Sequence, residues 1–423
     1  MRSRALLPLL SFVSALALFA EAHAGEPQTP TPAALGLRSF IDIAPDFHDR
    51  MLDWQWHVTE KAVAPLDGVA SGELQPGKLY VGGLVRGSVN MEHTNIFGKF
   101  PLLGQFPTKH KKQNRAGEFL WNNVHVGITA VPTEWLTGFV EVVYTNLVYP
   151  GQDQWQARKA FVTVGNLKQF PIYASFGKNS VEFGDMRAFN PFVHSMTNHY
   201  FNAHTEDGQL LVGYKQDGWH LTASAIGGGR QLRVADTPGK RGSISNFAVN
   251  GSKTWDFGDS LLVKLGAGYL HGTIYDANVA HHTSRDVSTS GDRITNGAWD
   301  VNGMVSYKGF DVQAEYTSTV KDWPVAGAPV TALTVQGRYT TTIQGWTAIA
   351  SAGFSRGSQG PDGTKWHEMK QWVAGFELKP HKQVSLAVEY VHSSDFVPLV
   401  RLTTSADPRV RSDTWTFGAR LHF

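Results

Sequence analysis

The chain contains no cysteine, carries almost no net charge, and has no long apolar run beyond its first residues. Without cysteine there is no disulfide framework, no thiolate metal site and no cysteine nucleophile. The formal charge of +2 comes from 38 basic and 36 acidic residues. Nucleic-acid-binding proteins have a much larger excess of basic residues. Aromatic residues make up 12% of the 423, too many for a disordered chain. The sequence therefore predicts a folded protein that does not bind nucleic acid.

The one long apolar run stands at the N-terminus. Arg2 and Arg4 precede it, and a small-residue cleavage site, Ala22-His23-Ala24, follows it. We predict that residues 1–24 are an export signal peptide. An uncleaved membrane helix is the weaker alternative, because such a helix needs about 20 consecutive apolar residues.

From Lys78 onward the chain consists of segments that alternate polar and apolar residues, which is the pattern of half-buried strands. The last segment, which ends at Phe423, shows the alternation most clearly, and helices are not expected in this region. Sixteen segments follow the pattern, near 78–92, 119–131, 134–145, 159–167, 172–178, 208–215, 219–227, 244–252, 260–271, 298–307, 310–318, 332–341, 346–355, 370–379, 384–392 and 413–423.

The connections between these segments alternate between short and long. Pro132-Thr133 and Lys308-Gly309 are short, whereas 93–118, 179–207 and 272–297 are long. Bacterial outer-membrane barrels have short periplasmic turns, long external loops and an even number of strands. We therefore predict an all-β fold, a transmembrane antiparallel β-barrel of about 16 strands at 78–423.

The width of such a barrel decides which face of each strand points inward. Sixteen strands enclose a lumen that side chains cannot fill, so the polar face is expected to line it and the apolar face to meet lipid. A closed barrel also pairs every backbone group inside the membrane. Aromatic residues near strand ends, such as Trp135, Trp346 and Trp415, fit the girdles found at membrane interfaces.

The C-terminal residues carry a family resemblance. Phe423, with apolar residues at every second position back to Trp415, resembles the terminal strand signature of Gram-negative outer-membrane proteins, which the barrel assembly machinery recognises. Residues 78–423 resemble a sixteen-stranded porin, and the stretch 161–177 resembles a hairpin of porin-like and LbtU-like siderophore-porin families. The resemblance implies passive diffusion of small hydrophilic solutes through the outer membrane, a homotrimer, and no cofactor.

Residues 25–77 differ from everything after them. Their Pro/Thr-rich start predicts a flexible linker, and apolar residues between Asp46 and Ala62 recur at helical spacing. We expect a periplasmic linker with one short helix that serves as a cap or a small oligomer contact. A plug inside the barrel is the less favoured alternative.

Charged residues on the polar face are the candidate pore-lining residues. Acidic residues on strands near 298–318 and a basic pair at the barrel seam could set up a transverse field, although scattered ion pairs would explain them equally well. The candidates are Arg86, Glu141, Lys159, Lys264, Asp300, Asp311, Glu315, Arg338, Glu377, Glu389 and Arg420.

The connection 179–207 is the best candidate for a constriction, because porins fold their third external loop into the channel. Its histidines recur every five residues, but a loop with that spacing defines no metal geometry, so no metal site is predicted. The candidate residues are Glu182, Asp185, Arg187, His194, His199 and His204.

Motifs of known enzymes are incomplete in this chain. The G-x-S-x-G match at 353–357 is not followed by a helix, and His367-Glu368 lacks the second histidine of a zincin. The sequence-based prediction is that the protein is not an enzyme. Two alternatives stay open: a porin specific for an iron chelate or another nutrient, and a non-conducting surface adhesin or enzyme barrel.

Overall fold

The structure is a computed structural model that describes residues 40–103, 112–148, 153–203, 208–227, 244–258, 260–276, 295–398 and 405–423. The predicted signal peptide and His204 lie outside these described residues. Residues 42–423 form one compact unit.

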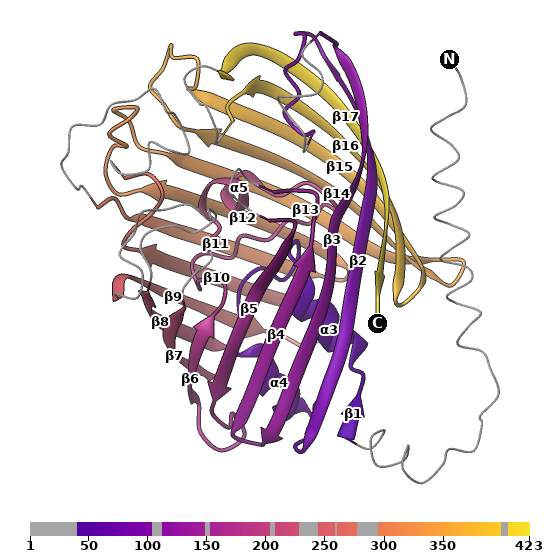
Figure 1. Cartoon of the computed structure of the whole chain (residues 1–423), viewed down its shortest axis with the longest axis vertical. Helices are drawn as coiled ribbons and strands as arrows, with labels where there is room; N and C mark the ends of the chain where they lie inside the picture. The colour runs from indigo at the N-terminus through magenta and orange to yellow at the C-terminus, as the bar shows by residue number, and fades with distance from the viewer. Residues whose placement is uncertain are drawn as a thin grey trace. The chain divides into compact units, whose positions relative to one another are not determined.

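Sixteen antiparallel strands, β2 to β17, form a closed barrel in which each strand pairs with the next and β17 pairs back with β2. Figure 1 shows the strands following one another in chain order. The predicted number of strands is confirmed. The strands are β2 (Lys78–Thr94), β3 (Arg115–Thr133), β4 (Leu136–Tyr144), β5 (Trp155–Val164), β6 (Ile172–Lys178), β7 (Gln209–Gln216), β8 (Trp219–Gly227), β9 (Ile244–Asp256), β10 (Leu261–Leu270), β11 (Ala298–Tyr307), β12 (Phe310–Thr319), β13 (Thr331–Ile343), β14 (Trp346–Ser358), β15 (Glu368–His381), β16 (Val384–Phe396) and β17 (Asp407–His422), besides a two-residue strand β1 (Ile41–Asp42).

Local sequence explains the tight turns. Lys308 and Gly309 both have positive φ, 47° and 85°, as do Asp217 and Gly218, 50° and 75°. Two consecutive residues with positive φ match the right-handed twist of a two-residue hairpin, and glycine tolerates that conformation best. These turns fix the register of the hairpins β11–β12 and β7–β8.

Side chains alternate across the wall as predicted. On β12, Phe310 and Val312 are exposed on the outside, whereas Gln313 and Glu315 are buried inside. The outward face is apolar and suits a lipid environment, since every strand finds its hydrogen-bond partners within the closed sheet.

The part of the chain that the structure describes contains three short helices beside the barrel: α3 (Pro45–Leu52), α4 (Ala64–Ser71) and α5 (Met196–Phe201). Among the described residues, no helix is long and apolar enough to cross a membrane. The helical pattern up to Ala62 predicted one longer helix, but α3 ends at Leu52. The buried amine of Lys61 donates hydrogen bonds to the carbonyls of Arg50 and Asp53, which satisfies backbone groups at that end.

The predicted N-terminal helix is therefore present, but its location differs from the prediction. It packs against the inner face of the barrel: a Cβ on Gly82 of β2 would lie 2.4 Å from Cγ of His48. Thr129 of β3 lies within hydrogen-bonding distance of the same imidazole, 3.3 Å. Phe47 and Met51 are fully buried in a cluster with inward-facing side chains of the wall. The apolar stripe of α3 thus faces an apolar patch inside the barrel. The predicted lumen was polar throughout, so this patch was not expected.

Candidate functional site

Two segments enter the barrel lumen, and we name them the N-terminal insert (residues 42–77) and the loop insert (residues 179–203, between β6 and β7). The loop insert contains α5, although helices were not expected after Lys78. Figure 1 shows α3, α4 and α5 lying among the strands. The contacts of these inserts with the wall define the candidate site.

The wall carboxylate of Glu315 on β12 holds the first part of the loop insert. Its carboxylate accepts hydrogen bonds from the backbone N–H groups of Asp185 and Met186, at 2.7 and 2.8 Å, and from the hydroxyl of Thr197, at 2.8 Å. The side-chain oxygen of Gln336 accepts from the N–H of Phe189 at 2.8 Å. Four residues of the loop insert are therefore attached to two neighbouring strands.

A second wall carboxylate, Glu389 on β16, holds the middle of the loop insert. It accepts hydrogen bonds from the N–H groups of Phe192 and Val193 at 3.0 and 3.1 Å. The ring of Phe192 lies directly over Gly418 of β17, where a Cβ would approach Cζ to 2.4 Å. Glycine at this position allows the loop insert to lie close to the wall.

Ion pairs hold the N-terminal insert. Asp53 lies 3.2 Å from Arg86 and 3.7 Å from Arg420, and Asp49 pairs with Arg420. Burial opposes ionisation of Asp53, but Arg420 and Arg86 hold its pKa below the ordinary value. At the other end of the insert, Asp67 of α4 pairs with a wall lysine, Lys215 of β7, at 2.6 Å.

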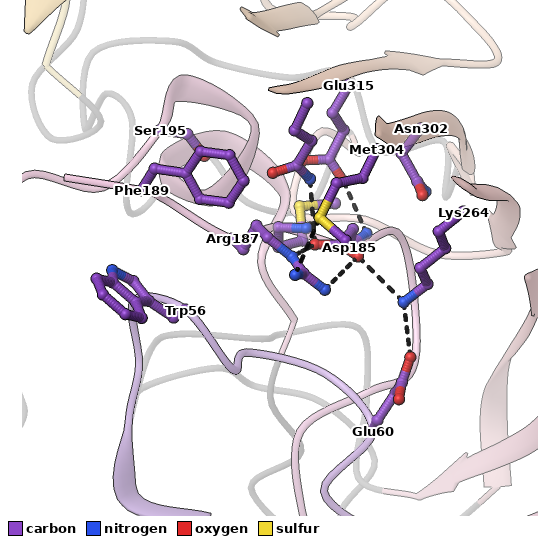
Figure 2. Close-up of polar contacts among 12 residues, drawn as sticks. Trp56, Glu60, Asp185, Arg187, Phe189, Ser195, Lys264, Asn302, Met304 and Glu315 are labelled. Carbon is purple, nitrogen blue, oxygen red and sulfur yellow. Dashed lines mark hydrogen bonds and ion pairs between the residues drawn. The ribbon is translucent and has the colours of Figure 1, made fainter. Parts of the chain in front are cut away.

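The two inserts meet at Lys264 of β10. Its Nζ lies 2.7 Å from Oε1 of Glu60 in the N-terminal insert and 3.3 Å from Oδ2 of Asp185 in the loop insert. Figure 2 shows this lysine between the two carboxylates. The N–H of Glu60 also donates to Glu182 of the loop insert at 2.8 Å. The charge of Lys264 holds the pKa of Glu60 well below its usual range.

Beneath the N-terminal insert the wall contains a buried group of charges. Glu141 of β4 contacts Nδ1 of His125 at 2.8 Å and pairs with Lys159 of β5. Trp54 covers this group, with its ring centroid 4.6 Å from that of His125. These three wall residues have almost no solvent exposure, so the insert seals this part of the lumen.

An apolar cluster lies between the loop insert and the connections after β10 and β12. Phe183, Met186 and Phe201 of the loop insert pack with Tyr275 and Trp323, which are both fully buried in the connections after β10 and β12. Apolar constrictions oppose the passage of water and ions. The described part of the two inserts therefore narrows the lumen, which is not a wide pore along the described residues.

The predicted pore-lining residues all face the interior, but the inserts cover most of them. Asp311 and Arg338 pair with each other and remain 16% and 19% exposed, although the rings of Trp56 and Phe189 from the two inserts lie over the Arg338 guanidinium. The expected field between an acidic and a basic patch is modified by local pairing: Asp311 pairs with Arg338 of the wall, and carboxylates of the N-terminal insert pair with the basic seam. The side chains of Lys264 and Arg420 remain 12% exposed. The residues that are buried are Arg86, Glu141, Lys159, Asp300, Glu315, Glu377 and Glu389.

The predicted constriction loop does fold inward, and it brings Glu182, Asp185 and Arg187 to the junction with the N-terminal insert. His194 and His199 lie on the same insert, away from these carboxylates in the chain. Among the described residues, no group of three or more histidines and carboxylates could hold a metal ion.

Sequence analysis missed the carboxylates of the N-terminal insert, Asp49, Asp53, Glu60 and Asp67. A signal for them was present at the barrel seam. Arg86 and Arg420 were expected side by side inside the barrel, and two opposed arginines need a counter-charge from elsewhere in the chain.

No family model matches the chain. Two UPF0422 proteins of Legionella pneumophila, from the strains Lens and Philadelphia 1, are each 22% identical to it over 73% and 76% of this chain. The matches cover 60% and 62% of those proteins, so the chain spans less than two thirds of their length.

Solved structures of outer-membrane proteins resemble the barrel. OmpF of Salmonella typhi in complex with daunomycin has a TM-score of 0.53 at 16% identity, covering 82% of this chain and 98% of OmpF. The anion-selective porin of Comamonas acidovorans has a TM-score of 0.53 at 10% identity, covering 82% and 99%. A trimer form of OmpT of Vibrio cholerae has a TM-score of 0.51 at 14% identity, covering 82% and 99%. The chain has the fold of the outer-membrane porins.

The prediction that the protein is not an enzyme is corrected by these findings. The similar structures include OmpT, described as an outer-membrane protein, beside the porins. At 15% identity such a likeness shows the barrel fold alone. One barrel fold can carry unrelated activities, so the fold gives no ground to exclude catalysis.

Proposed function

We propose that this protein is an outer-membrane channel for the passive diffusion of small hydrophilic solutes. The observation that supports it best is the closed sixteen-stranded barrel with a polar, charge-bearing inner face. A polar interior can hold water along a path across the membrane, whereas an apolar outer face meets lipid.

The two inserts make this channel selective or intermittent rather than permanently wide. They are attached to the wall on both sides of the lumen, and Lys264 joins them. Passage requires at least one insert to move. This arrangement also favours the second candidate function, a channel that serves one nutrient class, because a closed lumen needs a solute to stabilise its open state.

The partners follow from the same proposal. The apolar outer face would contact outer-membrane lipid, and Phe423 would serve as the signal to the barrel assembly machinery. A homotrimer is proposed by analogy with the trimer form of OmpT.

The test is the conductance of the refolded full-length mature protein in a planar bilayer under a salt gradient. We expect brief, small, weakly selective current steps, because the closed state dominates. Block or activation by one added nutrient would favour the nutrient-specific channel. A bilayer that stays electrically silent, although the protein is folded and inserted, would contradict the proposal.

A further inference from the structure

The seam of the barrel places two arginines face to face. Arg86 of β2 and Arg420 of β17 are direct partners in the strand register, and both side chains point inward. Like charges directly opposite each other on a sheet destabilise it. Within the described part of the chain, the ion pairs of these arginines are with Asp49 and Asp53 of the N-terminal insert.

The insert does not use all hydrogen-bond donors of this pair. A guanidinium group offers five N–H donors. Among the described residues, Nε of Arg420 is buried without a hydrogen-bond partner, and the side chain of Arg86 has one hydrogen bond, to Asp53 at 3.2 Å. Unused, fixed guanidinium donors suit a carboxylate, which can accept two parallel hydrogen bonds.

A small cavity adjoins these donors, with free space for about one water molecule before the insert moves. It lies where both inserts meet the wall, and Glu377 also lines it. The other residues that matter for recognition are the charged Asp53, Arg86 and Arg420 and the apolar or aromatic Trp56, Pro191 and Phe192. The rings would contact the apolar body of a solute, and Glu377 would disfavour a solute with several negative charges.

We propose that the Arg86–Arg420 pair is a binding site for a small solute with a single carboxylate, and that Asp53 occupies this site in the closed state as an internal competitor. The inference rests on the proposed channel and names its solute class. The Asp53 carboxylate contacts the same two guanidinium groups that the carboxylate of the solute would contact. A bound solute therefore displaces Asp53 and loosens the N-terminal insert at this point.

The test measures benzoate binding to the refolded full chain in detergent by isothermal titration calorimetry. Asp53→Asn should bind benzoate at least tenfold more tightly than wild type, because the competing charge is gone. The asparagine keeps an oxygen that can accept the N–H of Gln55, which Asp53 accepts at 2.9 Å. Asp53→Ser serves the same purpose should the asparagine variant fail to refold. Adding Arg86→Gln to either variant should abolish binding.

The matched control is Asp67→Asn, which breaks an ion pair of the same insert that contains no arginine. It should leave benzoate affinity unchanged, and uncharged benzamide should not bind any variant. Equal affinities of the Asp53 and Asp67 variants, or equal binding of benzamide and benzoate, would overturn the proposal. Benzoate binding without any current would contradict the proposed channel but not the binding site. Current through the protein, without tighter benzoate binding by Asp53→Asn, would contradict the binding site but not the channel.

Discussion

The two inserts occupy one lumen but are attached to its wall by different chemistry. The loop insert presents backbone N–H groups to wall carboxylates, as at Glu315 and Glu389. The N-terminal insert presents carboxylate side chains to wall cations, as at Lys215, and adds apolar packing around Phe47. In one case the wall supplies the hydrogen-bond acceptors, and in the other it supplies the positive charge.

The difference predicts unequal responses to conditions. A buried hydrogen bond contributes about 0.5–1.5 kcal/mol, and removing one partner leaves the other unsatisfied at a cost of about 1–3 kcal/mol. Partly exposed ion pairs contribute about 0–1 kcal/mol and are screened by salt. The loop insert should therefore keep its position over a wide range of conditions, whereas the N-terminal insert should respond to salt and pH.

The largest effect is expected from Glu315→Ala. The change removes the acceptor of two backbone N–H groups and one hydroxyl in a buried site, and should destabilise the docked loop insert by about 3 kcal/mol or more. Hydrogen exchange should become faster across residues 185–197. Glu368→Ala is the control, because that carboxylate pairs with Arg356 and Lys370 instead. Unchanged exchange in the first variant would show that another contact holds the loop insert.

The second prediction concerns the N-terminal insert and uses a steric change in the wall beneath α3. Gly82→Ala would place a Cβ 2.6 Å from Cβ of His48, so α3 must shift away from the wall. We expect a cost of about 1–3 kcal/mol in docking of the N-terminal insert, as for an overpacked core. Gly337→Ala is the matched control on β13, where the nearest atom would lie at 3.6 Å.

Protease accessibility of the N-terminal insert checks this prediction. It should increase for Gly82→Ala and stay unchanged for Gly337→Ala, while the loop insert keeps its protection in both. Loss of protection in both inserts at once would mean that they dock as one unit, and the comparison between them would fail.

The response to pH should come from Lys61. Burial lowers the pKa of its amine from the ordinary 10.5 to about 7. Between these values the undocked amine binds more protons than the docked one, so docking becomes stronger as pH rises from 7 to 10, by up to about 1.4 kcal/mol per pH unit. Hydrogen exchange of α3 amides, corrected for the intrinsic pH dependence, measures this. Lys61→Met should remove this dependence on pH. Docking that becomes weaker as pH rises in the wild-type protein would contradict the prediction.

The smallest effect is expected from salt. Raising the ionic strength from about 0.1 to 1 M shortens the Debye length from about 10 to 3 Å and should weaken the half-exposed pair of Lys215 and Asp67 by less than 1 kcal/mol. A cysteine introduced at Ser71, at the end of α4 in this cysteine-free chain, reports the change through its labelling rate. With the native Asp67, the labelling rate should rise as salt is added. With Asp67→Asn, which removes the ion pair, the rate should not change with salt.

The sequence predicts the barrel well because its signal is repeated in every strand. Alternation of polarity gives the strands, and Lys308-Gly309 and similar pairs give the turns. The strand ends are less certain. β3 begins at Arg115, four residues before the predicted start at 119, because pairing continues beyond the alternating stretch.

The interior is harder to predict, because the residues that contact each other there are far apart in the chain. Nothing near Asp53 indicates that its carboxylate meets Arg420, and the buried position of Lys61 depends on a helix end and a wall that come together only in the fold. The inward loop was predicted from family resemblance. Its attachment through backbone N–H groups to Glu315 has no side-chain pattern that a sequence could show.

The central claim is that the inserts close a conducting barrel and that the N-terminal insert can be released. Its most direct test is single-channel conductance of a variant with Asp67→Cys and Lys215→Cys joined by a short reducible bismaleimide, measured before and after cleavage of the linker. The absence of native cysteine makes the cross-link specific. We predict rare, small current steps while the insert is tethered, and more frequent or larger steps after cleavage. Identical conductance in the two states would contradict the account.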